Sequence, residues 1–474
     1  MGNTITENVS KFCTEVEYED LPQNAIHETK RSILDTIGCA LGGLETDKGS
    51  LGLKFAQMAG GPPEAIILGT GEKVAVSMAA FANGETMHAL DSEALLPPGH
   101  VAAFVIPAPL GLAEMRNASG KELILAVALS LEVASRIGTS LGGFRTKTGA
   151  QLRSYGFGSC IFGAAAGAGR IMRLDSEKMA DAFGIAGYFA PVPSHQKYVF
   201  TPYNGLQKYG PAGWTAQGGV TAAILAEMGE RGDRSVLDGD YGFWAMNGSP
   251  SCNWDMITDN LGTKWCLLQV KYKRWPACAL MLSPLRAFTN IIEHNNLQPE
   301  EIVKVLVKND AQNNEPQFLK KEVHNNCDAQ NSIFYNIAVA AHRIKLGPLW
   351  QARSTMENPN IQAFMNKVKF EVYAKADEVR YHELTVEKRN YLNRRPARVE
   401  VTARGKVFTE EIECAEWITS EAPGFPATDE DLINKFRENT ENVLSTGKTK
   451  KAIDMILNLE KVNDANELIK VLIR

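Results

Sequence analysis

Two histidines and an aspartate fall together in one short stretch of the sequence. His88 and Asp91 belong to an apolar helix predicted over residues 76–90, and their i, i+3 spacing predicts that they share one face of it. His100 follows a helix-breaking Pro-Pro-Gly sequence and precedes a second apolar helix, predicted over residues 105–114. A loop held between buried helices is a frequent place for catalytic groups. An ordinary helix-loop-helix corner with a surface histidine is the alternative interpretation.

Histidine is the side chain best suited to exchange a proton near neutral pH. His100 is therefore the predicted proton-transfer residue, because the Pro-Pro-Gly break can turn its ring into a cleft. Asp91 is predicted to orient that ring or to fix its tautomer, as carboxylates do for catalytic imidazoles. His88 lies within the apolar helix, where we expect a packed, hydrogen-bonded core histidine.

Two lysines lie just ahead of predicted helices. Lys208 precedes a Gly/Pro break and a helix predicted over residues 215–227, and Lys273 begins the sequence Lys-Arg-Trp-Pro-Ala-Cys, which ends at Cys278. An ammonium group beside a helix N-terminus favours anionic ligands, because the exposed N–H groups attract the same charge. Each lysine taken alone fits a solvated surface residue better.

Two further motifs are predicted to be structural. The polar residues 328–332 lead into an apolar helix that carries Tyr335, and a capped helix start is the default interpretation. The sequence Gly-Thr-Gly-Glu-Lys at residues 69–73 lacks the spacing and the Ser/Thr of a phosphate-binding loop. We interpret it as a turn.

Composition limits the classes of function. The net charge of -5 is spread along 474 residues, which gives no reason to expect a nucleic-acid partner or an anionic membrane surface. The eight cysteines include no C-x-x-C pair and are interpreted as reduced thiols. From the sequence we identify no apolar run that is long enough to span a bilayer. We therefore expect a cytoplasmic protein with neither nucleic-acid nor membrane partners.

The pattern of apolar residues changes once along the chain. Residues 1 to about 265 predict one helix after another, with end signals at Pro22, Ser119 and Asp175. After that point apolar and polar residues alternate in segments that predict strands, with a hairpin around Gly405; these segments are 270–272, 302–308, 369–373, 398–402 and 407–412.

The predicted fold class is mainly α with two domains. Residues 1–268 and 416–474 form a large all-helical domain from both ends of the chain. Residues 269–415 form a smaller inserted α+β domain that acts as a lid.

Several motifs, in this order and spacing, resemble the MmgE/PrpD family, which includes 2-methylcitrate dehydratase, cis-aconitate decarboxylase and iminodisuccinate epimerase. The resemblance covers nearly the whole chain. Ser92-Glu93-Ala94 and Cys278 look closest to the fungal cis-aconitate decarboxylases. The motifs that carry the resemblance are His-Ala-Leu-Asp at 88–91, His100 six residues ahead of Ile106-Pro107, the Gly/Ala-rich helix near residue 163, the Lys208 segment, Lys273-Arg-Trp-Pro-Ala and the helix start at 332–335.

The resemblance implies both a site and an assembly. The implied catalytic residues are His100, Asp91, Tyr335 and Lys273, and the implied substrate-binding residues are Lys208, Lys273 and Cys278. It also implies a site with no cofactor and no metal, in a cleft between the helical domain and the lid. The expected assembly is a homodimer through the helical domain.

The implied activity is that of a cofactor-free carbon-carbon or carbon-oxygen lyase. Its expected substrate is a small polycarboxylate that resembles citrate or aconitate, including alkylcitrates, and the reaction is decarboxylation or dehydration. Two alternatives stay open: an epimerase or isomerase that moves a proton on a carbon beside a carboxylate, and a rewired noncatalytic member of the family.

Departures from the family pattern bear on this choice. Ser92-Glu93-Ala94 stands where Asp-Asp-Thr is common, Gln330 replaces a basic residue, and residues 153–157 lack the histidine of a Phe-His-Pro motif. A dehydratase needs an acid for the departing hydroxyl as well as a base at carbon, so a missing imidazole weakens that assignment most. A decarboxylase needs a proton donor and cations that hold carboxylates, which His100 and the two lysines supply.

Overall fold

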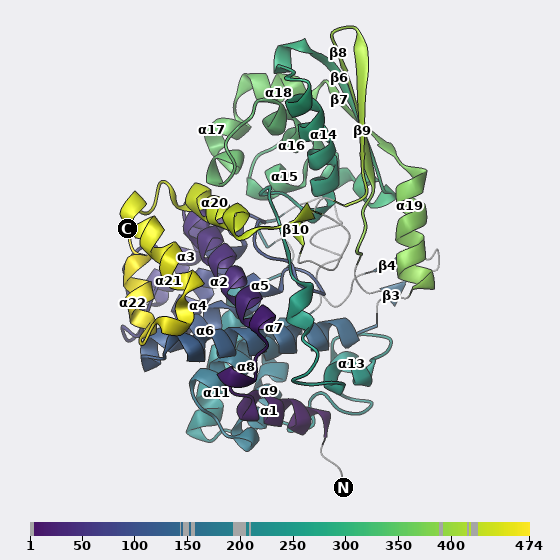
Figure 1. Ribbon diagram of the computed structural model, residues 1–474. Coiled ribbons are helices and arrows are strands. Elements are labelled where there is room, and N and C mark those ends of the chain that lie inside the picture. Colours follow the sequence, from purple (N-terminus) through teal and green to yellow (C-terminus); the bar gives the residue numbers. More distant parts are fainter. Residues whose placement is uncertain are drawn as a thin grey trace.

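Helices form most of the chain and strands a small part, so the fold is mainly α, as predicted (Figure 1). Lys208, a predicted substrate-binding residue, lies outside the residues that the structure describes, and so do residues 153–156. This computed structural model describes residues 4–142, 144–145, 151–152, 157–192, 205–207, 210–387, 392–414, 417–418 and 425–474.

The first half of the chain is mainly helical, with two short antiparallel strand pairs, β1 (Ala65–Ile66) with β2 (Lys73–Val74) and β3 (Phe144–Arg145) with β4 (Gln151–Leu152). The end signals predicted from sequence are confirmed: α2 begins after Pro22, Ser119 forms a capping box with Glu122, and the side chain of Asp175 accepts a hydrogen bond at the start of α9. The helices are α1 (Ile5–Glu15), α2 (Gln23–Gly43), α3 (Asp47–Ala59), α4 (Val76–Ala89), α5 (Val101–Val105), α6 (Pro107–Arg116), α7 (Gly120–Ser140), α8 (Cys160–Ile171), α9 (Ser176–Phe189), α11 (Ala212–Met228), α12 (Phe243–Met246) and α13 (Trp254–Thr258).

Helices α7 and α8 pack closely at the centre of this helical part. An added Cβ on Gly163 of α8 would lie 2.3 Å from the carbonyl oxygen of Ser130 on α7, so the contact requires a glycine there. Helix α7 is long and apolar enough to cross a bilayer, which corrects the sequence interpretation that no run reaches that length. The apolar segment of α7 is completely buried by neighbouring elements, as expected for a core helix.

A four-stranded sheet defines the smaller α+β part. Its strand order is β7-β6-β8-β9, with only β6 and β7 parallel. The predicted hairpin is confirmed, and Gly405 at its turn has a φ of 69°. Helix α14 packs on β8 and β9. The elements are α14 (Leu282–His294), β6 (Ile302–Asn309), α15 (Asn326–Asn331), α16 (Ile333–Ala341), α17 (Arg353–Met356), α18 (Pro359–Met365), β7 (Val368–Val372), α19 (Ala374–Tyr381), β8 (Ala397–Ala403) and β9 (Lys406–Ile412).

Short strands also mark where the chain enters and leaves this part. Strand β5 (Lys271–Tyr272) pairs antiparallel with β10 (Trp417–Ile418), which in turn pairs with β11 (Phe425–Pro426). Segments almost 150 residues apart in sequence therefore lie side by side. This arrangement is compatible with an insertion over residues 269–415, whose motion as a lid stays a prediction. A separate strand pair is formed by β1 and β2. The predicted turn at residues 69–73 lies in the connection between them, and its last residue, Lys73, begins β2.

The last helices return to the first part of the chain. Helices α20 (Asp429–Thr440) and α21 (Thr446–Leu457) contact α2, and α22 (Ala465–Val471) contacts α6. In Figure 1 these yellow helices lie beside the purple N-terminal helices. The ammonium Nζ of Lys435 on α20 lies 2.6 Å from Oδ1 of Asp35 on α2, and both side chains are buried. A buried ion pair thus joins the two ends of the chain.

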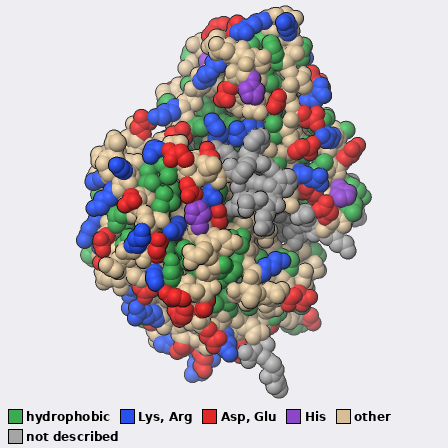
Figure 2. Space-filling view, viewed as in Figure 1, with side chains coloured by type: hydrophobic (Ala, Val, Ile, Leu, Met, Phe, Trp, Pro, Cys, Tyr) green, Lys and Arg blue, Asp and Glu red, His purple; other side chains and the backbone are tan. Residues whose placement is uncertain are grey.

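Charged side chains on the surface are mixed in sign. On the face shown in Figure 2, basic and acidic side chains are interspersed, and neither sign dominates this face. This distribution agrees with the small net charge of the chain.

We predict that Lys435→Met lowers the free energy of unfolding by about 3–5 kcal/mol, because it leaves the buried carboxylate of Asp35 without its cation. Chemical denaturation followed by circular dichroism measures the change. The double variant Lys435→Met/Asp35→Leu should recover much of the loss, since no unpaired charge remains. A double variant that is no more stable than Lys435→Met would show that the charge of Asp35 is not the cause.

Candidate active site

The segment that carries the predicted site begins with the end of α4. The helix ends at Ala89, and Asp91 has a φ of 53° in the left-handed region. His88 and Asp91 therefore do not share a helix face, which corrects the sequence prediction. Aspartate is among the residues that tolerate this conformation best. The turn directs the chain back toward His100, which directly precedes α5.

Asp91 forms an ion pair with Lys273, and the family resemblance implies both as site residues. Nζ of Lys273 donates to Oδ1 of Asp91 at 2.7 Å and also to the backbone carbonyl of Asp91. Both side chains are completely buried. Lys273 lies just after β5, so this ion pair joins the inserted part of the chain to the end of α4.

His100 lies against two acidic residues. Its Nε2 is 3.5 Å from Oδ1 of Asp91, within ion-pair distance, and its Nδ1 is 2.9 Å from Oε1 of Glu93. The predicted proximity of His100 and Asp91 is present. However, the hydrogen-bond partner of Nδ1 is the carboxylate of Glu93, which was not among the predicted site residues. No local sequence signal separates Glu93 from any other residue of a helix-ending turn.

Glu93 also binds the second histidine. Nδ1 of His88 lies 2.5 Å from the same Oε1, and both side chains are completely buried. The prediction of a packed, hydrogen-bonded His88 is therefore confirmed, but its partner connects it to the site. Burial alone would raise the pKa of Glu93. The charges and hydrogen bonds of His88 and His100 outweigh burial and hold that pKa well below its ordinary value of 4.5.

Aromatic rings confine the two imidazoles. The ring centroids of His88 and His100 are 5.2 Å apart at an interplanar angle of 69°. Phe104 packs edge-on against His88, and Phe157 against His100 at 5.9 Å and 88°. These contacts limit the rotation of both rings, so His100 is held in one orientation.

His88, Glu93 and His100 together offer the ligand types of a metal site, and their ligand atoms lie within 4.8 Å of one another. Ligands at about 2.0–2.2 Å from a tetrahedral zinc ion lie roughly 3.3 Å apart. The distances of 2.5 and 2.9 Å from Oε1 to the two ring nitrogens are shorter than that and are those of hydrogen bonds. The arrangement fits a hydrogen-bonded cluster better than a metal centre, and the expected lack of a metal stays a prediction.

The other predicted residues lie in the inserted part of the chain. The hydroxyl of Tyr335, on α16, donates to the carbonyl of Trp350 at 2.6 Å, and burial raises the pKa of Tyr335. Cys278 is buried, and its backbone N–H donates to the carbonyl of Gln330 at 3.0 Å. The hydroxyl of Tyr335 is thus fixed by a hydrogen bond within the inserted part of the chain. Its catalytic role and the substrate-binding role of Cys278 stay predictions.

Two glutamines connect the inserted part to the turn after α4. The side-chain amide of Gln330 donates to the carbonyl of Ala89 at 2.7 Å. That of Gln351 donates to the carbonyls of Leu90 and Pro276, at 2.8 and 2.6 Å. These bonds satisfy the carbonyls of the last residue of α4 and of the residue after it, and they place the turn against the inserted part. In the sequence, Gln330 stood out only because it replaces a basic residue of the family pattern, and no pattern indicated a role for Gln351.

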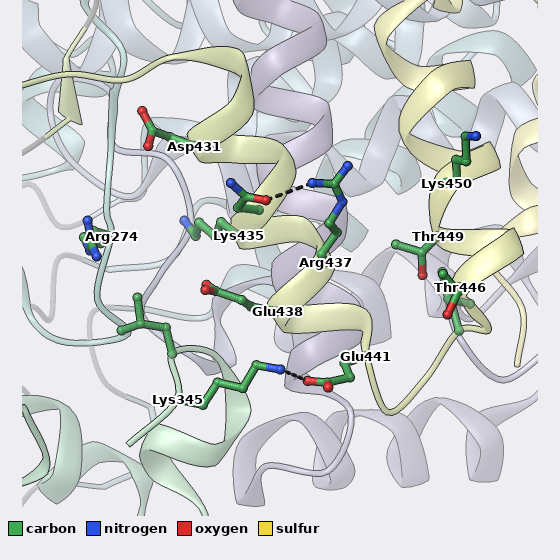
Figure 3. Close-up of a pocket in the computed structure, with 13 residues that line it drawn as sticks. Arg274, Lys345, Asp431, Lys435, Arg437, Glu438, Glu441, Thr446, Thr449 and Lys450 are labelled. Atoms are coloured by element: carbon green, nitrogen blue, oxygen red, sulfur yellow. Dashed lines mark hydrogen bonds and ion pairs between the residues drawn. The ribbon is translucent and has the colours of Figure 1, made fainter. Parts of the chain in front are cut away.

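A separate hollow of about 640 Å³ lies between α20 and α21 (Figure 3). Arg274, Lys435 and Glu438 border it, and Lys345 and Glu441 pair with each other on its wall. It borders the site at Lys435, whose ammonium donates to the carbonyl of Ser92 as well as to Asp35. The hollow does not contain the His100 cluster, so its size alone does not make it the active site.

Comparison with known proteins covers the whole length of the chain. A family model of the MmgE/PrpD N-terminal domain matches residues 7–252, and one of the MmgE/PrpD C-terminal domain matches residues 275–461. A cis-aconitate decarboxylase from Aspergillus terreus is 24% identical, over 99% of this chain and 96% of that protein. A cis-aconitate decarboxylase from Homo sapiens is 25% identical, over 100% and 95%. The cis-aconitate decarboxylase-like protein oryM of Aspergillus oryzae is 26% identical over 57% and 58%.

The low pKa of Glu93 predicts how stability depends on pH. A carboxyl group whose pKa falls on folding stabilises the protein at pH values above its ordinary pKa of 4.5. This stabilisation is lost as the pH falls through the lower pKa of the folded state. Glu93→Gln should therefore be less stable than the parent at neutral pH, and the difference should shrink as the pH falls below 4.5. Urea denaturation across this pH range measures the difference. A difference that stays constant would contradict the assignment of an ionised Glu93.

Proposed function

Because the chain belongs to the MmgE/PrpD family, we propose that it is a lyase that acts on a citrate- or aconitate-like polycarboxylate, and that cis-aconitate decarboxylation is its reaction. The observation that carries the proposal is the buried contact of His100 with Asp91, which is itself paired with Lys273. The imidazole of His100 and the carboxylate of Asp91 come from one short stretch, and the ammonium group of Lys273 comes from a distant part of the chain. All three are residues that the family resemblance implies for the site. Similarity to cis-aconitate decarboxylases over nearly the whole chain supports the choice of reaction.

The proposed mechanism uses one proton transfer. Loss of CO2 breaks a carbon-carbon bond and leaves its electron pair on the remaining carbon skeleton. A proton from Nε2 of His100 then bonds to carbon, and solvent returns the proton to the ring. Such general acid catalysis suits an imidazole near neutral pH. Dehydration would require a second group to protonate the departing hydroxyl, so a single proton-transfer histidine favours decarboxylation.

Cationic side chains hold the substrate in this proposal. Lys208 binds one carboxylate of the substrate. Lys273 pairs with Asp91 and lies on the side of the cluster that faces the substrate. Each charge-assisted hydrogen bond to a carboxylate contributes about 1.5–3 kcal/mol. The expected homodimer, the lid motion and the lack of a cofactor belong to the same proposal.

A substrate panel tests the reaction class. Purified protein is mixed in deuterated water with cis-aconitate, 2-methylcitrate and a longer alkylcitrate, and products are followed by NMR. Release of CO2 with deuterium on the product carbon is the expected result. Loss of water instead would indicate a dehydratase, and exchange without net loss an epimerase or isomerase. No change with any compound would contradict an enzymatic role on these substrates.

The role of His100 is tested by substitution. His100→Gln should lower kcat by about 10²- to 10⁴-fold, the range typical of a lost general acid or base, while circular dichroism shows that the variant still folds. Some loss of stability accompanies it, because the buried carboxylate of Glu93 loses one of its two imidazole partners. His324→Gln is the matched control, since the His324 side chain is 76% exposed. If His100→Gln keeps most of its turnover while Tyr335→Phe loses it, the proton is transferred elsewhere.

The two lysines should respond differently to substitution. Lys208→Met should raise KM with little change in stability. Lys273→Met should also destabilise the fold, by about 3–5 kcal/mol, because it removes the ammonium group that pairs with the buried carboxylate of Asp91. Steady-state kinetics and denaturation of both variants measure these effects. Unchanged kinetics in Lys208→Met would remove that residue from the site.

A further inference from the structure

One carboxylate oxygen holds both imidazoles of the cluster. Oε1 of Glu93 lies 2.5 Å from Nδ1 of His88 and 2.9 Å from Nδ1 of His100. We propose that Glu93 is a positioning residue of the reaction, which fixes the tautomer and orientation of His100 and stabilises its proton-donating form by negative charge. This inference rests on the proposed function, in which His100 transfers the proton, and adds a residue to it.

The hydrogen-bonding chemistry of Glu93 determines the tautomer. An ionised carboxylate accepts hydrogen bonds and donates none, so each Nδ1 that bonds to Oε1 carries the hydrogen. In neutral His100 the acceptor nitrogen is then Nε2. Nε2 lies 3.5 Å from Oδ1 of Asp91. Proton exchange with a substrate is therefore directed to the side of the ring that faces Asp91 and Lys273.

The two acidic neighbours of His100 differ in how their charge is balanced. Asp91 forms a 2.7 Å ion pair with Lys273, whose positive charge already compensates it. Glu93 bonds to two imidazoles, each of which is positive only when it gains a proton. When His100 gains the proton that it will donate, Glu93 is the carboxylate that stabilises the new charge.

The backbone around Glu93 is held on both sides. Lys435 donates to the carbonyl of Ser92, and Leu95 exchanges two backbone hydrogen bonds of 2.7 Å with Lys271. Glu93 is completely buried, whereas His100 keeps 5% of its surface exposed. Glu93 therefore acts through His100 rather than on the substrate, and its carboxylate has little freedom to move.

The length of the Glu93 side chain matters for its contacts with both histidines. A glutamate here reaches both Nδ1 atoms from a turn that begins at the left-handed Asp91. An aspartate is one methylene shorter, and we expect it to reach at most one ring.

The test compares Glu93→Gln and Glu93→Asp with the parent. Glu93→Gln keeps the shape and removes the charge, so kcat should fall by roughly 10²-fold with KM nearly unchanged. The pH above which kcat declines should also move down by about one unit, because the protonated imidazole loses its stabilising charge. Glu93→Asp keeps the charge, so its pH profile should stay near that of the parent although its kcat falls.

A spectroscopic measurement makes the result independent of turnover. In protein labelled with ¹⁵N-histidine, the signals absent from His100→Gln belong to His100, and their shifts report which ring nitrogen carries the hydrogen. The parent should show hydrogen on Nδ1, and Glu93→Gln a mixture of the two tautomers. Glu114→Gln removes another buried carboxylate, on α6, and should change neither the tautomer nor the pH profile.

The outcomes separate the two proposals. An unchanged tautomer together with an unchanged pH profile in Glu93→Gln would overturn the positioning role. A parent protein that turns over none of the polycarboxylates, but whose His100 changes tautomer in Glu93→Gln, would contradict the proposed function and leave the hydrogen-bonding role of Glu93 supported.

Discussion

A carboxylate removed from water must be paired, because an unpaired buried charge costs several kcal/mol. The turn at residues 91–93 buries two of them completely, Asp91 and Glu93. Lys273 pairs with the first, and the imidazoles of His88 and His100 bind the second. The chain must therefore bring distant side chains to this turn before the fold is stable, and the requirement that stabilises the turn also assembles the proposed site.

The rest of the architecture follows from that requirement. Strand β5 delivers Lys273 at the point where the chain enters the inserted part. Helix α20 returns from the C-terminal end and places Lys435 against Asp35 and the carbonyl of Ser92. Small residues in α8 allow this helix to pack closely on α7, and the two helices form part of the core of the helical part. The helical part and the inserted part are thus joined by buried polar contacts at the site itself.

Much of this could be predicted from the sequence. The capping box at Ser119, the hairpin around Gly405 and the mainly helical fold follow from local patterns of apolar, turn and capping residues. The proximity of Asp91 and His100 was expected from the stretch that they share, and that of Lys273 because the family resemblance grouped it with them. Glu93 was not expected as a partner of His100, because a hydrogen bond across seven residues depends on how the turn bends, and the left-handed Asp91 that bends it carries no sequence signal.

A crystal structure with bound tricarballylate, a saturated tricarboxylate that cannot lose CO2 in the same way, would show directly whether the substrate binds at His100. We predict that the ligand lies against the buried cluster, with a carbon atom facing Nε2 of His100 and Nδ1 still bonded to Glu93. A ligand bound instead in the hollow between α20 and α21, with His100 distant from it, would contradict the assignment of the site.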